Sequence, residues 1–204
     1  DSASRMLDPE NFAKLFMAQI YVNNSDWLSN NRKCWKKRTT SYQANAPYGQ
    51  DGRYRWFIFD LDHGFKYPDE DRLDIVMSGT GADTRIFRGL MENTSFKRYW
   101  INLMADNMNT SFKTDRVLDI IDSLNLIYDP EVPEHKARWW YMWDNNSTDE
   151  MEDFALQRPY YMRQFMLDQF SELTDTNEII LNVQNNIGGK IKINTTVIDE
   201  NTAG

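Results

Sequence analysis

Apolar residues recur at helical spacing near the start of the chain. They fall at positions i, i+3, i+4 and i+8, which form one face of an α-helix, and they are Phe12, Leu15, Phe16 and Ile20. The preceding Asp8, Pro9 and Glu10 suit a helix start: Asp caps free N–H groups, Pro fits the first turn, and Glu complements the helix dipole. The pattern predicts a helix from residue 9 to about 22, ended by Asn23-Asn24-Ser25.

Alternating side chains predict a β-hairpin next. Residues 53–59 alternate between two faces, and both faces become largely apolar towards Phe59, so we expect that end to be buried. Residues 33–36 form a plausible partner strand, and the polar stretch between them ends in the turn dipeptide Asp51-Gly52. We expect loops on both sides of the hairpin, over 26–31 and 60–82.

The rest of the chain is mostly helical in pattern. Helices are expected over 83–90, 95–108, 114–127, 129–142 and 147–170. Pro133 is expected to disturb the fourth, Pro159 to kink or interrupt the fifth, and a capping box at 147–150 to open the fifth. Strands over 178–183 and 190–193 would form a C-terminal β-hairpin. The predicted fold is therefore α+β and mainly α-helical, with a domain over 5–174 and an appended segment over 175–204.

Composition narrows the classes of function. The length of 204 residues suits one domain. A net charge of -8 argues against nonspecific binding to nucleic acid or to an anionic membrane. The lone Cys34 excludes an intramolecular disulfide and a Cys-rich zinc site, and no apolar run is long enough to span a bilayer.

Candidate chemistry begins in the loop before the hairpin. Asp26 and Asn31 have the D-x-x-x-x-N spacing of a kinase catalytic loop. Kinases use the Asp near the acceptor hydroxyl and the Asn on a metal ion. The spacing alone also fits an ordinary Asx-turn. The order of parts brings the kinase interpretation level with the Asx-turn, because a helix, this loop, two strands, Asp60 and Gly64 follow one another as in kinases.

The second acidic segment, Asp60-Leu61-Asp62-His63-Gly64, allows more than one interpretation. Asp60 directly follows the strand, as a metal-binding Asp should, while Asp62-His63-Gly64 copies the Asp-x-Gly form. A hydrophobic strand ending in Asp-x-Asp also fits a haloacid-dehalogenase-type phosphatase, with Asp60 as nucleophile and Asp62 as general acid, although Gly64 stands where Thr or Val is expected. A noncatalytic kinase-like interaction module is the third alternative.

Over roughly residues 8–170 the chain resembles the spore coat protein H (CotH) kinase family. The matching residues include Asn11-Phe12, Gln19-Ile20-Tyr21, Asp26-Trp27, Asn30-Asn31, Trp35, Arg55-Trp56, Asp60 to Phe65, Pro130-Glu131 and Arg158-Pro159.

The resemblance implies the C-terminal lobe of a kinase-like fold and an atypical kinase that uses ATP with Mg²⁺ or Mn²⁺ on Ser/Thr of a protein substrate. Asp26 would be the catalytic aspartate, and Asn31 and Asp60 would bind the metal and nucleotide. Asp62 matches a less constrained position, as a further metal ligand. The family also implies an extracellular or cell-surface location; the oligomeric state stays open.

One departure from a complete kinase affects the expected activity. No Gly-rich phosphate loop, strand lysine or partner glutamate precedes Asp26. The N-terminal lobe that covers ATP is therefore missing, and the abrupt start at Asp1 suggests an excised fragment. We expect this fragment alone to have little or no kinase activity.

Overall fold

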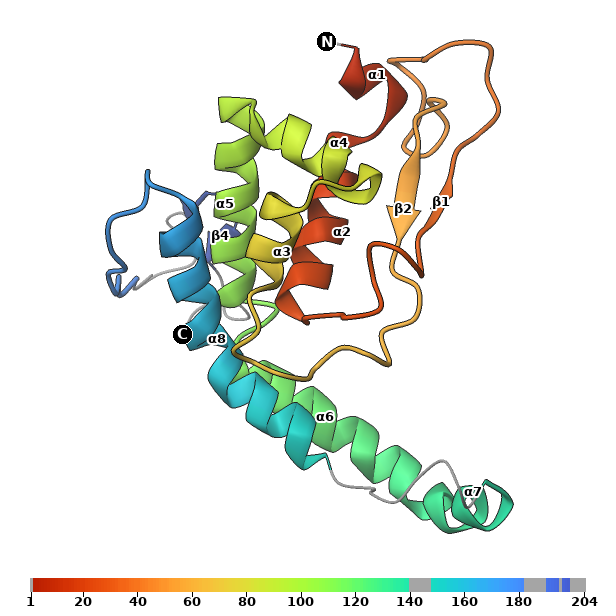
Figure 1. Ribbon diagram of the computed structural model, residues 1–204, viewed down its shortest axis with the longest axis vertical. Coiled ribbons are helices and arrows are strands. Elements are labelled where there is room, and N and C mark those ends of the chain that lie inside the picture. Colours follow the sequence, from red (N-terminus) through yellow and green to blue (C-terminus); the bar gives the residue numbers. More distant parts are fainter. Residues whose placement is uncertain (1, 140–147, 182–189, 195, 199–204) are drawn as a thin grey trace.

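The computed structural model describes residues 2–139, 148–181, 190–194 and 196–198. It is mainly helical and carries two small antiparallel hairpins (Figure 1). The elements are α1 (Ala3–Met6), α2 (Pro9–Tyr21), β1 (Lys33–Trp35), β2 (Arg55–Phe57), α3 (Arg72–Ser78), α4 (Ala82–Met91), α5 (Thr94–Met108), α6 (Thr114–Tyr128), the 3-10 turn η1 (Asp129–Glu131), α7 (Val132–Arg138), α8 (Asp149–Gln169), β3 (Ile191–Ile193) and β4 (Thr196–Ile198).

Helix α2 lies at the centre of the main core, where the sequence predicted a helix. Asp8 caps it by accepting a hydrogen bond from the N–H of Asn11 at 3.3 Å. Its apolar face is buried, and the ring of Phe16 stacks on Phe87 of α4 with centroids 4.3 Å apart. Helices α3 and α5 and strand β2 also contact α2. The helix that precedes the candidate site is thus held on several sides.

The hairpin of β1 and β2 forms as predicted but is shorter. Cys34 pairs with Trp56, and Trp56 packs against Phe12 of α2 with ring centroids 4.8 Å apart. The expected burial of the far end is wrong: residues 57 to 59 have exposed fractions of 43 to 48%. The two-stranded ladder packs against α2 on one side and ends at Phe57. The apolar residues at its far end therefore stay exposed.

Helix α3 corrects the expected loop over 60–82. Asp71 caps it by accepting from the N–H of Asp74 at 2.9 Å, and Leu73 and Val76 are fully buried. Burial of these two apolar side chains offsets the cost of forming so short a helix. The loop that follows Asp60 therefore ends where α3 begins, at Arg72.

Helix α8 continues across Pro159, so the expected interruption does not occur. A proline lacks the N–H that would bond the carbonyl of Ala155. Instead, the hydroxyl of Thr114 on α6 donates to that carbonyl at 3.3 Å. The side chain of Thr148, the residue before α8, bonds that of Glu152 and does not cap the helix. The expected capping box begins at Ser147, which lies outside the described residues.

Helix α6 and the first half of α8 pack side by side and extend away from the body formed by α2 to α5, with α7 at the far end (Figure 1). The helix expected over 129–142 appears as η1 followed by α7, which ends at Arg138, and residues 140–142 lie outside the described part of the chain. No helix among the described residues is long and apolar enough to cross a membrane.

The C-terminal hairpin forms with a different partner strand. Residues 178–181 are not a strand, so that prediction is wrong there, and 182–183 lie outside the described residues. Strand β3 pairs instead with β4, which the sequence analysis did not predict, with Ile193 opposite Thr196. The side chain of Asn194 joins this hairpin to α5 by donating to Asp106 at 2.9 Å.

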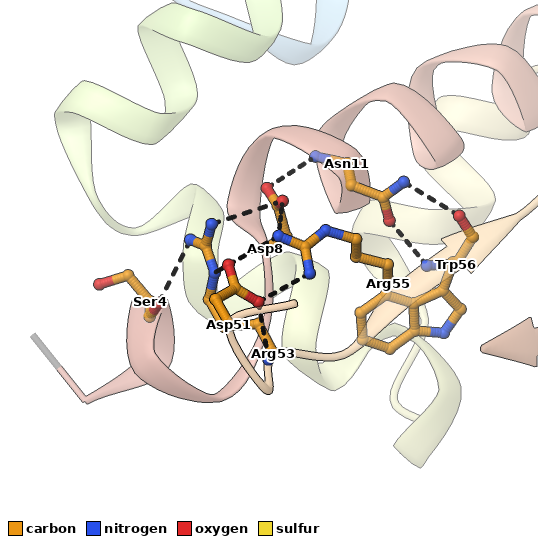
Figure 2. Close-up of polar contacts among 7 residues, drawn as sticks. All are labelled: Ser4, Asp8, Asn11, Asp51, Arg53, Arg55 and Trp56. Atoms are coloured by element: carbon orange, nitrogen blue, oxygen red, sulfur yellow. Dashed lines mark hydrogen bonds and ion pairs between the residues drawn. The ribbon is translucent and has the colours of Figure 1, made fainter. Parts of the chain in front are cut away.

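A buried group of charges fixes the hairpin to the start of α2 (Figure 2). Arg55 donates to both carboxylate oxygens of Asp51, at 2.8 and 2.7 Å, and also pairs with Asp8 at 2.9 Å. Arg53 binds Asp51 from the other side at 2.8 Å. Each buried charge in the group therefore has a partner of opposite sign, as burial requires.

The side chain of Asn11 completes this attachment. It donates to the carbonyl of Trp56 at 3.0 Å and accepts from the N–H of Trp56 at 2.7 Å, so one amide satisfies both backbone groups of a β2 residue (Figure 2). The hairpin is thus attached to α2 by charge and by backbone recognition.

The substitution Asp51→Ala should lower the free energy of unfolding by about 3–5 kcal/mol, because it leaves the buried guanidinium of Arg55 short of a partner. Urea unfolding measures this. Asp69→Ala, at an exposed carboxylate, is the matched control and should change stability little. Equal effects of the two substitutions on stability would contradict the role of Asp51 as the stabilising partner of Arg55.

The stability that Asp51 contributes should depend on pH. Hydrogen bonding from Arg55 holds the pKa of Asp51 well below its usual range, whereas in the unfolded chain the pKa is about 3.9. The stabilisation is therefore present above about pH 4 and is lost as pH falls towards the folded pKa. The difference in unfolding free energy between wild type and Asp51→Ala should be constant from neutral pH to about pH 5 and narrow below about pH 4.

Candidate functional site

The loop after α2 holds the Asp26 carboxylate on both of its oxygens. Asn30 donates its amide to one oxygen at 2.7 Å, and Asn31 donates to the other at 2.9 Å. Asn31 has a left-handed backbone, with φ of 51°, which Asn tolerates better than most residues. Because the amide nitrogen of Asn31 is committed to Asp26, its amide oxygen is the atom left for a cation.

The second loop places Asp60 directly after β2. Asp60 is exposed and has a φ of 57°, a conformation that is costly for a residue with a Cβ. A hydrogen bond shared with the side chain of Asp62 is the main cause that raises the pKa of Asp60, and the negative charge of Asp26 adds to it. The negative charges of Asp62 and Asp26 therefore disfavour ionisation of Asp60.

Residues at the end of α2 join the two loops. The fully buried side chain of Asn24 donates to the carbonyl of Asp60 at 3.0 Å and accepts from the N–H of Asp26 at 3.2 Å. The N–H of Ser25 donates to the carbonyl of His63 at 3.3 Å. Segments more than thirty positions apart in the sequence therefore form one hydrogen-bonded unit.

Gly64 allows the backbones of the two segments to approach closely. A Cβ built at this position would lie 3.3 Å from the carbonyl oxygen of Val22 and 3.1 Å from that of Leu61. The N–H of Phe65 donates to the same Val22 carbonyl at 2.8 Å. A side chain at position 64 would crowd these carbonyls, so a glycine suits the close approach of the two segments.

Asn23 anchors the part of the second loop that leads to α3. Its amide nitrogen donates to the carbonyls of Lys66 and Tyr67 at 2.8 and 3.1 Å. Its amide oxygen accepts from the guanidinium of Arg72 at 3.0 Å, and Arg72 also pairs with Glu70 at 3.0 Å. The loop is consequently fixed from its acidic start to its end at α3.

Arg158 of α8 binds both the end of α2 and the loop that follows Asp60. Its guanidinium is fully buried and donates to four backbone carbonyls at 2.7 to 2.8 Å, those of Ile20, Tyr21, Pro68 and Glu70. The first two belong to the last turn of α2, whose carbonyls lack helical partners. Burial lowers the pKa of Arg158 to about 10, so the side chain stays charged at neutral pH.

The structure thus joins Asp26 to Asn31 directly and links the Asp26 and Asp60 loops through Asn24, while Asp62 and Asp26 raise the pKa of Asp60. Within the described ranges, no group of three or more His, Cys, Asp or Glu residues is arranged to hold a metal ion. A cation at this site would therefore need the Asn31 amide oxygen and ligands from outside the chain.

Sequence reasoning missed the residues that hold the site together. It treated Asn23 and Asn24 only as the end of a helix, and it gave Arg158 no role. Two signals were present: consecutive amides at a helix end, where Asn readily takes the left-handed form, and an arginine among apolar residues of a long helix.

Comparison with known proteins gives one match. A family model described as CotH kinase protein matches residues 1–162. Searches of curated proteins and of solved structures found no match to the chain.

Arg158→Met should lower the free energy of unfolding by at least about 3 kcal/mol, because it removes the donor to four carbonyls, two of which belong to the buried residues Ile20 and Tyr21. Urea unfolding is the measurement, and Arg85→Met, at an exposed helical arginine, is the control. If both variants unfold at the same urea concentration, Arg158 does not hold these segments.

Proposed function

Because this chain belongs to the CotH kinase protein family, we propose that it supplies the catalytic and metal-binding loops of an ATP-dependent protein kinase. In this proposal the helical body over 5–174 corresponds to the C-terminal lobe of a kinase-like fold, and 175–204 is an appended segment. One observation carries the proposal: Asp26, Asn31 and Asp60 come from two distant loops that a shared hydrogen-bond network holds together.

Asp26 has the features that an acceptor-orienting carboxylate needs. Both of its oxygens are held by amide donors, so its orientation is set before substrate arrives. In the proposed reaction it orients the hydroxyl of a Ser or Thr on a protein substrate and accepts its proton during phosphoryl transfer from ATP.

Asn31, Asp60 and Asp62 would hold Mg²⁺ or Mn²⁺. These residues offer the oxygen ligands that such hard cations prefer, and Mg²⁺ commonly uses one or two carboxylates, with water and phosphate oxygens completing its shell. Asp62 raises the pKa of Asp60, as expected for two carboxyl groups that repel each other, and a cation would relieve that repulsion. When bound, the ion would neutralise charge on the phosphates of ATP.

The phosphatase alternative lacks support. It would place Asp60 at the carboxyl end of a strand in a doubly wound parallel sheet. In the described parts of the chain the strands form two separate antiparallel pairs, and Asp60 follows one of them. The extracellular or cell-surface location and the protein nature of the substrate remain proposals that rest on the family.

Titration with Mn²⁺, followed by the loss of the free-ion electron paramagnetic resonance signal, tests the cation site. Wild type should bind one ion saturably, and Asp60→Asn should abolish that binding because it removes a ligand charge. Asp69→Asn, which alters an exposed carboxylate in the same segment, should leave the affinity unchanged. A chain whose Mn²⁺ binding is absent or insensitive to Asp60→Asn would instead fit the noncatalytic module.

A second experiment separates the roles of the two aspartates. In a kinase assay of the natural protein, Asp26→Ala should lower kcat for phosphorylation about 10²–10⁴-fold and weaken Mn²⁺ binding less than Asp60→Ala does, because Asp26 acts on the acceptor and reaches the ion only through Asn31. Asp60→Ala should lose both. Full activity in Asp26→Ala would remove it from the catalytic role.

A further inference from the structure

Asn24 is the residue whose side chain contacts the backbone of both candidate loops. It lies three positions after the end of α2, and its exposed fraction is 0%. Its amide group has two N–H donors and one oxygen acceptor. One acceptor partner is the carbonyl of Asp60 at 3.0 Å, another is Oε1 of Gln19 at 3.0 Å, and its own oxygen accepts from the N–H of Asp26 at 3.2 Å.

The neighbours of Asn24 do not share this position. The side chain of Asn23 contacts residues 66, 67, 70 and 72, beyond the acidic part of the loop. Ser25 contacts the carbonyl of His63. Of these three consecutive polar residues, Asn24 therefore has the contacts that determine where Asp26 and Asp60 lie relative to each other.

The contact with Asp60 has a further consequence because Asp60 has a left-handed backbone, with φ of 57°. Such a conformation persists in a residue with a Cβ only when its surroundings hold it. The hydrogen bond from Asn24 to the Asp60 carbonyl is one such restraint, and it fixes the peptide from which the Asp60 carboxylate projects.

Gln19 explains how Asn24 itself is held. Two bonds join them: the N–H of Asn24 donates to the Gln19 carbonyl at 3.2 Å, and Nδ2 of Asn24 donates to Oε1 of Gln19 at 3.0 Å. Gln19 lies on α2 and is fully buried. The buried side chains of Gln19 and Asn24 thus connect α2 to both loops by hydrogen bonds.

We propose that Asn24 is a positioning residue that sets the separation between the Asp26 and Asp60 carboxylates, and with it the size of the cation site between the loops. This inference rests on the proposed function, since it assigns that separation a role in binding Mg²⁺ or Mn²⁺. Asn24 touches neither substrate nor ion; it acts through the backbones of the two loops.

The test compares three variants in the 204-residue chain. Asn24→Ala removes all three side-chain bonds. Gln19→Met removes only the support of Asn24, and it should fold because it also removes a buried donor, Nε2 of Gln19, that has no partner among the described residues. Asn93→Ala is the matched control: it removes the cap of α5, an asparagine bond to the N–H of Phe96 at 3.0 Å.

Two quantities are measured: Mn²⁺ affinity, and amide hydrogen exchange at Ser25 and Phe65, whose N–H groups cross between the segments without bonding Asn24. Asn24→Ala should weaken Mn²⁺ binding about 10–100-fold, the usual effect of losing an outer-shell partner, and should speed exchange at both amides while α2 amides stay protected. Gln19→Met should change both quantities in the same direction by less. Asn93→Ala should change neither.

The inference is overturned if Asn24→Ala and Gln19→Met match Asn93→Ala in Mn²⁺ affinity and in exchange at Ser25 and Phe65. It is also overturned if exchange rises equally throughout α2, because that would show general destabilisation. If wild type binds no Mn²⁺, the proposed cation site fails. Hydrogen exchange then decides alone: selective loosening of the two crossing amides supports the positioning role of Asn24, and unchanged amides refute it.

Discussion

The site depends on how the polar groups at the end of α2 are satisfied. The last carbonyls of a helix have no partners within it, and the last three residues of α2 are buried. Arg158 supplies donors to the carbonyls of Ile20 and Tyr21 and, with the same guanidinium, to the loop beyond Asp60. One helix end therefore brings together α8, the Asp26 loop and the Asp60 loop. Because unpaired buried carbonyls are costly, these segments are stable together and unfavourable apart.

Backbone strain concentrates in these two segments. Residues with a Cβ take left-handed conformations before, between and after the acidic positions: Asn23, Leu28, Asn31, Asp60, Phe65 and Tyr67. Each such residue costs free energy and persists only when neighbouring contacts compensate for it. The bonds made by Asn23, Asn24 and the Phe65 N–H supply that compensation. The loops thus have a fixed shape, which a site that must hold ligand atoms in one geometry requires.

How much the sequence predicts follows from the range of the interactions. Helix α2 was predictable because its cap and apolar spacing are local signals, and so was the β1–β2 pairing around Asp51-Gly52. The role of Arg158 was not, because its partners lie 88 to 138 positions away. The exposure of Phe57 and Phe59 was misjudged because strand composition does not reveal how many layers cover a sheet. The candidate residues could be named from spacing, but the amides that hold them together became apparent only in three dimensions.

Crystals of the chain grown with Mn²⁺ and measured at its absorption edge test the central claim most directly, because anomalous scattering locates the ion. The account predicts a peak about 2.0–2.6 Å from oxygens of Asp60 and of the Asn31 amide, with Asp26 nearby and still held by Asn30 and Asn31. An ion bound elsewhere, or Asp26 and Asp60 on separate parts of the surface, would contradict it.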